Sequence, residues 1–141
     1  MPHEPRAVWK RVRVQTDSKQ LRAVGEEILA FCAAFGFTEE DLFAIRLGYE
    51  EATANAAHHG NRNDPSKAIT IEYEVSTARV WIRVTDEGTG FDPANVPDPT
   101  LPQNLDRPSG RGLMLMRHYM ETRIVPPGNT VELIRRRGGR P

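Results

Sequence analysis

The chain has 141 residues, with 19 lysine and arginine residues against 19 aspartate and glutamate residues, so its formal net charge is zero. A domain of this length buries roughly two thirds of the surface that its unfolded chain exposes, and a hydrophobic content of 38% excludes a disordered chain. Neutrality excludes a surface built throughout for nucleic acid or anionic lipid, so we expect one domain, residues 1–141, with no direct nucleic-acid or membrane contact.

The first predicted elements are an edge strand and an amphipathic helix. Apolar and basic side chains alternate in residues 8–14, which is the period of a half-solvated strand. A helix follows that begins at Asp17 or Ser18, either of which is a good N-cap, and ends at Gly36. The apolar residues that recur there at spacings of three and four are Leu21, Val24, Ile28, Phe31 and Phe35.

A second helix is predicted directly after the first. Thr38 and Asp41 stand in capping-box spacing at its start, and Gly60 marks its end. Its apolar stripe comprises Leu42, Ile45, Tyr49, Ala52 and Ala56. The opposite face of this helix carries polar residues with possible chemistry.

Two β-rich runs come next, residues 69–75 and 80–86. The few residues between them predict an antiparallel hairpin. Further along the chain, residues 113–121 predict a third helix and residues 130–134 a final strand. Because strands and helices are mixed and the strands pair locally, we expect an α+β fold, a two-layer sandwich of a mixed, mostly antiparallel sheet covered by helices on one face.

The segment of about residues 92–109 differs from the rest of the chain. Five of the eleven prolines fall between Phe91 and Gly110, so regular hydrogen-bonded structure is not expected there. An irregular stretch of this length inside a small domain is usually a lid or a binding loop, and otherwise a disordered segment.

The polar face of the second helix carries Glu51, Asn55 and His59 at spacings of four. Residues four apart lie one helical turn from each other and can reach one ligand. An asparagine oxygen suits Mg²⁺, and a carboxylate one turn away can orient or deprotonate a hydroxyl. The alternative is an ordinary solvated helix face.

Two glycine-rich motifs follow. Asp86 ends the second hairpin strand and precedes Gly88 and Gly90, so its carboxylate can accept a hydrogen bond from the exocyclic amine of a base beside closely approaching backbone. The second motif, Ser109–Leu113, leads into a helix whose N-terminus can bind phosphate. A simple turn and a flexible connection are the respective alternatives.

These boxes, E-x-x-x-N, D-x-G-x-G and G-x-G-L in that order, resemble those of the GHKL ATPase superfamily. EATANAAHHGN (51–61), VTDEGTGFDP (84–93) and SGRGLMLMRHYME (109–121) are similar to the branch of anti-sigma factors that act as serine-protein kinases. The resemblance implies the Bergerat-type histidine-kinase-like ATPase fold, with residues 92–109 as the ATP lid.

The resemblance also implies roles for single residues. Glu51 would be the general base and Asn55 the ligand of Mg²⁺, while Asp86 would anchor the adenine of ATP. The further ATP-binding residues would be Gly88, Gly90, Ser109, Gly110, Arg111, Gly112, Leu113 and Thr130.

The partners that the resemblance implies are a sigma factor, which is sequestered, and an anti-anti-sigma factor, which is phosphorylated on serine or threonine; a homodimer is implied as well. Only 50 residues precede Glu51, and the predicted strand and helices fill them. We therefore expect the phosphoryl acceptor to be a separate protein.

Two other functions fit the same sequence. One is a catalytically silent nucleotide-binding module that sequesters a regulator, and the other is a domain that binds no nucleotide and whose glycines are structural. The single Cys32 excludes an intramolecular disulfide, and no apolar run approaches the roughly 20 residues that span a bilayer. We expect a cytoplasmic protein.

Overall fold

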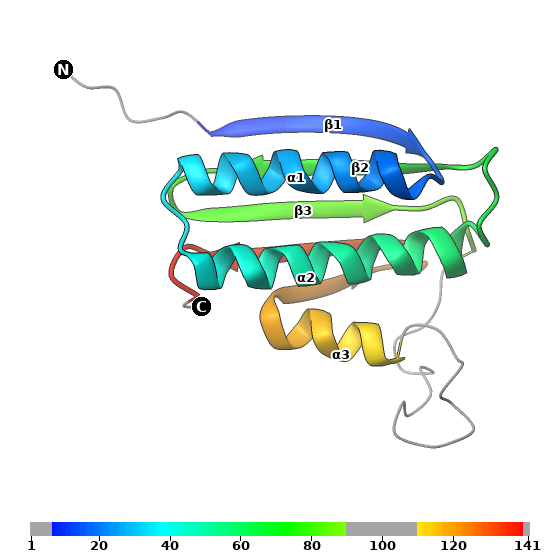
Figure 1. Cartoon of the computed structure of the whole chain (residues 1–141). Coiled ribbons are helices and arrows are strands. Elements are labelled where there is room, and N and C mark those ends of the chain that lie inside the picture. The colour runs from blue at the N-terminus through cyan, green and yellow to red at the C-terminus, as the bar shows by residue number, and fades with distance from the viewer. Residues whose placement is uncertain (1–6, 90–109, 140–141) are drawn as a thin grey trace.

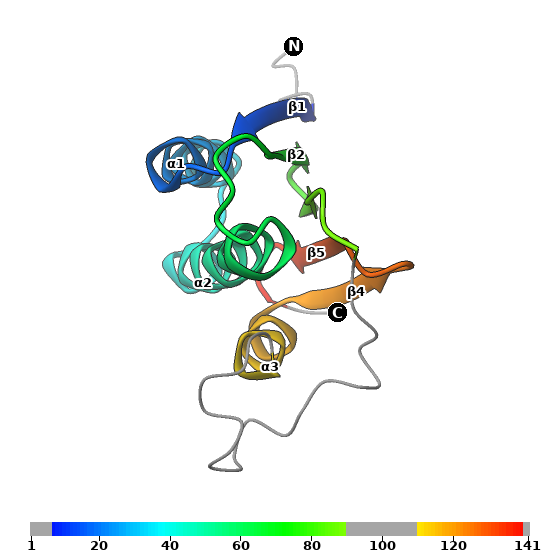
Figure 2. The same cartoon turned by 90° about the vertical axis from the view of Figure 1, so that its right-hand side faces the viewer.

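The computed structural model describes residues 7–89 and 110–139, which form one sheet with helices on one of its faces (Figures 1 and 2). The strands are β1 (Val8–Gln15), β2 (Ala68–Val75), β3 (Arg79–Thr85), β4 (Glu121–Val125) and β5 (Thr130–Arg136). Their order in the sheet is β1-β2-β3-β5-β4, and every neighbouring pair is antiparallel. The expected two-layer α+β sandwich is confirmed, but the described sheet is antiparallel throughout rather than mixed.

The helical layer contains α1 (Ser18–Ala34), α2 (Glu39–Asn55) and α3 (Gly110–Tyr119), and α2 continues into a short π-helix, η1 (Ala56–Gly60). Asp17 caps α1, because its carboxylate accepts the backbone N–H groups of Lys19 and Gln20. The capping box of Thr38 and Asp41 at the start of α2 is present as predicted.

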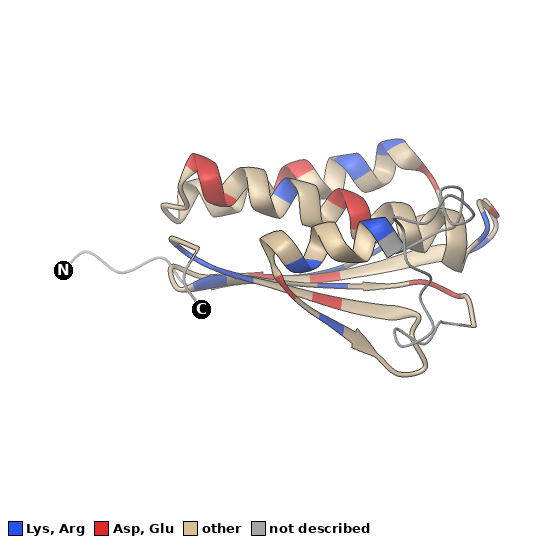
Figure 3. Cartoon of the chain, turned by 90° about the horizontal axis from the view of Figure 1, so that it is seen from below, with Lys and Arg blue, Asp and Glu red and all other residues tan. Residues whose placement is uncertain are grey.

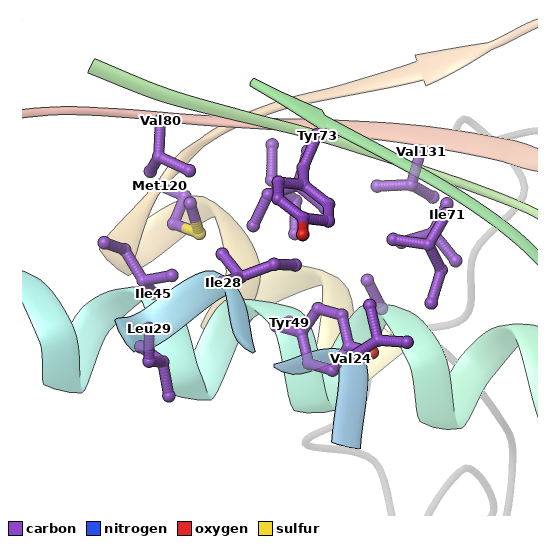
Figure 4. Close-up of a cluster of buried hydrophobic side chains, with 14 of the residues drawn as sticks. Val24, Ile28, Leu29, Ile45, Tyr49, Ile71, Tyr73, Val80, Met120 and Val131 are labelled. Atoms are coloured by element: carbon purple, nitrogen blue, oxygen red, sulfur yellow. The ribbon is translucent and has the colours of Figure 1, made fainter. Parts of the chain in front are cut away.

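Alternate residues of the central strands supply the core. Ile69, Ile71, Tyr73, Val75, Val80, Ile82 and Val84 are all buried. They pack against the apolar stripes of α1 and α2, which contribute Val24, Ile28, Ile45 and Tyr49 among others (Figure 4). Cys32 is fully buried in this core, and burial raises the pKa of its thiol to about 12.

The structure corrects two predicted elements. The third helix spans Gly110–Tyr119 rather than residues 113–121, and Glu121 opens strand β4, which the sequence did not predict. Strand β4 is only five residues long and owes its conformation to pairing with β5, a long-range contact. The last turn of the second helix, Ala56–Gly60, is π-helical rather than α-helical.

A buried ion pair between Asp41 and Arg135 joins the helical layer to the sheet at the start of α2. Asp41 is fully buried and accepts hydrogen bonds from Arg135 Nε at 3.0 Å and from the Gly138 N–H at 2.9 Å. Arg135 also donates to the carbonyl of Tyr119, at the end of α3. The start of α2 and the ends of α3 and β5 are thereby fixed to one another.

Acidic and basic residues are interspersed along the described helices and strands (Figure 3). On the open face of the sheet, Arg83 lies 3.9 Å from Glu72 and 3.6 Å from Glu132. In the part of the chain that the structure describes, no helix has the length and apolar character that crossing a membrane requires.

Candidate functional site

The end of α2 meets the first turn of α3. A Cβ atom built on Gly112 would lie 2.9 Å from Glu51 Oε2 and 3.2 Å from Asn55 Nδ2. Both side chains are partly buried at this contact. The structure therefore brings the first and third sequence boxes together, although about 60 residues separate them along the chain.

A pocket of about 450 Å³ begins at the same asparagine and extends to the end of β3. This volume is within the range of small-molecule sites, roughly 300 to 1,000 Å³. Its walls include Asn55, His59, Lys67, Asp86, Gly88 and Gly128. Asn55 thus connects the pocket to Glu51 and to the N-terminus of α3.

A second hollow, of about 520 Å³, lies between α1 and α2. Leu21, Ile28 and Tyr49 are part of its lining. None of Glu51, Asn55 and Asp86 lines it. The smaller pocket is therefore the candidate functional site, because Asn55 and Asp86 line it and Glu51 lies one helical turn from Asn55.

Asp86 lies in the wall of this pocket, directly after β3. Its Oδ1 accepts the Gly88 N–H at 2.7 Å, which fixes the side chain against its own turn. Burial raises the pKa of Asp86, while the Gly88 N–H and the charge of Lys67 act in the opposite direction. A partly buried carboxylate held in this way is a directional acceptor for a donor on a ligand.

The last predicted contact in this region is Thr130, at the start of β5. It pairs with Thr85, the residue before Asp86, and the two hydroxyl groups lie 3.2 Å apart. The structure thus places Thr130 beside the strand end that carries Asp86. Its neighbours Gly128 and Val131 line the pocket, whereas Thr130 does not.

The predicted phosphate-binding segment forms the start of α3. Gly110, Arg111, Gly112 and Leu113 are its first residues, and Arg111 is exposed. The side chain of Leu113 is buried in the core, where it packs rather than faces solvent. Gly90, Ser109 and the predicted lid, residues 92–109, lie outside the described residues.

Two basic residues of the pocket were not predicted from the sequence. Lys67 and Arg62 come from the turn-rich segment after η1 and add positive charge to the lining. His59, which the sequence predicted on the same helix face as Glu51 and Asn55, lines the pocket as well; burial and the neighbouring His58 lower its pKa, which favours the neutral imidazole. The only signal for Lys67 and Arg62 was the basic composition of a segment that otherwise predicts a turn.

The donor set fits a divalent cation together with phosphate. The amide oxygen of Asn55 and the carboxylate of Glu51 are hard oxygen ligands of the kind that Mg²⁺ prefers. The backbone of α3 approaches both side chains so closely that a Cβ at Gly112 would fill the space between them. Free N–H groups at such a helix start attract anions.

Comparison with known proteins is consistent with this arrangement. Residues 14–135 match the family described as histidine kinase-like ATPase domain. The anti-sigma F factor of Geobacillus stearothermophilus is 34% identical over 101 residues, which are 70% of this chain and 68% of that protein. The anti-sigma F factor of Anoxybacillus flavithermus is 34% identical over 116 residues, or 77% and 78% of the two chains.

A solved structure shares the fold. The crystal structure of the RsbU and RsbW domains of Rv1364c from Mycobacterium tuberculosis superposes with a TM-score of 0.61 at 19% identity, over 90% of this chain and 31% of that longer chain. The family match covers both the Glu51–Asn55 helix and the Asp86 strand end. The chain therefore belongs to the histidine kinase-like ATPase family, together with the anti-sigma F factors.

Proposed function

We propose that the chain is an ATP-binding anti-sigma factor with serine/threonine-protein kinase activity. It sequesters a sigma factor and phosphorylates an anti-anti-sigma factor. The observation that carries this proposal is the contact of Gly112 with both Glu51 and Asn55, beside the pocket that holds Asp86. The identity of 34% with two anti-sigma F factors supports the choice of partners.

The nucleotide would lie along the pocket, from Asp86 to the start of α3. The carboxylate of Asp86 would accept the exocyclic amine of adenine, with Gly88, Gly90 and Thr130 nearby. The triphosphate would extend past Asn55 to Ser109, Gly110, Arg111, Gly112 and Leu113. Lys67 and Arg62 add charge that favours an anionic ligand.

Asn55 would hold Mg²⁺, whose chemistry is to neutralise charge on the phosphate oxygens. Glu51 is the carboxylate next to the α3 N-terminus, where the terminal phosphate would lie. It would accept the proton of an incoming serine or threonine hydroxyl as the new O–P bond forms and the bond to the ADP oxygen breaks.

The proposed function also includes a lid, a cellular location and an assembly. Residues 92–109 would close over the nucleotide as a lid. The chain would act in the cytoplasm, as a homodimer, and phosphorylation would alter the docking surface of the anti-anti-sigma factor by adding negative charge.

A phosphoryl-transfer assay tests the kinase activity. Proteins that the tagged chain captures from native cells in the presence of ATP are incubated with γ-labelled ATP and either the wild type or Glu51→Gln. We expect label on a serine or threonine of one captured protein with the wild type only. Equal absence of transfer with both forms, while both bind ATP, would instead identify a catalytically silent module that sequesters its partner.

A further inference from the structure

The polar side chain of Asn61 is fully buried directly after η1, and each of its polar atoms is satisfied. Its Oδ1 accepts the Glu87 N–H at 2.8 Å. Its Nδ2 donates to the Ala68 carbonyl and to Thr16 Oγ1, both at 3.0 Å. A buried amide with three hydrogen bonds fixes the segments that it joins, because moving any of them leaves a buried polar group unpaired.

The group fixed by Asn61 is the turn that carries Asp86. The Glu87 N–H belongs to the residue that follows Asp86, and the Gly88 N–H bonds the Asp86 carboxylate at 2.7 Å. On the other side, the Asp86 N–H donates to the Asn129 carbonyl at 2.9 Å, and Asn129 Nδ2 donates to the Asp86 carbonyl at 3.1 Å. The two asparagines therefore bond successive residues of the turn, Asn129 at Asp86 and Asn61 at Glu87.

Gly60 explains why the turn fits against η1. A Cβ atom on Gly60 would overlap the carboxylate of Asp86, and one on Gly88 would overlap the Gly60 carbonyl. The carboxylate thus lies directly on the backbone of η1, one residue before the asparagine that bonds its turn. The π-helical geometry of Ala56–Gly60 puts Gly60 and Asn61 at this contact.

We propose that Asn61 and Asn129 are positioning residues, which fix the position of the Asp86 carboxylate relative to the base of the nucleotide. This inference rests on the proposed function, in which Asp86 reads the exocyclic amine of adenine. Discrimination by one hydrogen bond requires that the acceptor be held in place, and the asparagines supply that rigidity without touching the ligand.

The test compares the affinities for ATP and for inosine triphosphate, whose base has a carbonyl oxygen where adenine has the amine. The wild type is expected to prefer ATP by about tenfold or more, as the loss of a hydrogen bond to a charged group implies. In Asn61→Leu the preference should fall severalfold, because the Glu87 N–H is no longer held and Asp86 shifts. Asn129→Ala should reduce the preference in the same direction.

Thr16→Val is the matched control. It removes one hydrogen bond of Asn61 and the one that the Thr16 hydroxyl donates to the Lys67 carbonyl. The Glu87 N–H stays bonded to Asn61, so the variant should lower the melting temperature and leave the ATP preference unchanged. An unchanged preference in folded Asn61→Leu would overturn the proposal, and if that variant does not fold, an unchanged preference in Asn129→Ala would do so. A wild type that binds both nucleotides equally would contradict the adenine role of Asp86 itself, and this proposal with it.

Discussion

At the scale of single residues, the missing side chain of Gly112 is what lets the first turn of α3 lie against Glu51 and Asn55. The spacing of Glu51 and Asn55 on one helix predicted their common direction, because residues four apart share a helical face. The contacts of Gly60 and Asn61 with the Asp86 turn could not be predicted, since they join segments about 25 residues apart and depend on a π-helical turn.

Gly112→Ala tests this contact. The new methyl group would lie 2.9 Å from Glu51 Oε2, so the carboxylate and Asn55 must move. We expect phosphoryl transfer to fall by about tenfold or more, as small displacements of reacting groups imply. The melting temperature should change little, because the gain of about 1 kcal/mol from alanine over glycine in a helix offsets the cost of the close contact.

Met114→Ala is the control for that variant, because Met114 lies on the same helix and is exposed. It should transfer phosphate at the wild-type rate. Transfer at an undiminished rate by Gly112→Ala would show that the close approach has no part in catalysis.

At the scale of elements, the starts of α1 and α2 were predictable from local chemistry, whereas a short strand was not. Asp17 and the Thr38–Asp41 box cap their helices through backbone groups within three residues. Strand β4 has no such local signal: Met120 continues the apolar pattern of α3, and only the pairing with β5 makes residues 121–125 extended. Asp41 has a second role, the ion pair with Arg135, that its capping position did not reveal.

Asp41→Asn should destabilise the fold at neutral pH by about 3 kcal/mol, because it leaves the largely buried Arg135 without its charged partner. Burial alone would raise the pKa of Asp41, but hydrogen bonds from Gly138, Thr38 and Arg135 lower it overall. The ionised carboxylate therefore stabilises the fold above the unfolded-state pKa of about 3.9, and this contribution is lost as the pH falls through the lower folded-state value.

Urea unfolding of Asp41→Asn and wild type from pH 7 down to pH 3 measures this contribution. The difference in unfolding free energy should be largest at neutral pH and shrink below about pH 4. Glu40→Gln, an exposed acid in the same helical turn, should differ little from wild type throughout. A difference for Asp41→Asn that does not vary with pH would exclude the ion pair as its source.

The packing of α1 on α2 provides a second prediction at this scale. Gly25 faces the ring of Tyr49, and a Cβ there would lie 2.6 Å from Tyr49 Cε2. Tyr49 cannot retreat easily, because it is buried and its hydroxyl donates to the Leu21 carbonyl. Gly25→Val should therefore cost about 1 to 3 kcal/mol through overpacking.

Thermal unfolding compares Gly25→Val with Ala23→Val, an exposed position of the same helix that shares the cost of a β-branched residue in a helix. We expect a clear loss of stability only at residue 25. Equal melting temperatures for the two variants would contradict the prediction, because they would show that α1 and α2 accommodate the larger side chain at residue 25 without loss of stability.

At the scale of the whole molecule, the fold collects one site from four distant segments. The end of α2 supplies Asn55, the strand end of β3 supplies Asp86, the turn before β5 supplies Gly128, and α3 supplies Gly112. Because β5 lies between β3 and β4 in the sheet, the turn before it comes beside Asp86. The order of the boxes along the chain predicted that they share a ligand. The pairing of β3 with β5, which brings the turn before β5 to the pocket, could not be read from that order.

The most direct measurement is calorimetric titration of the wild-type chain and of Asp86→Asn with Mg-ATP. The wild type should bind one nucleotide per chain, and Asp86→Asn, which keeps the shape of the side chain but not its charge, should bind at least about tenfold more weakly. Chelation of Mg²⁺ should weaken binding to the wild type. No binding by the wild type, or equal affinity in a folded Asp86→Asn, would contradict a nucleotide site in this pocket.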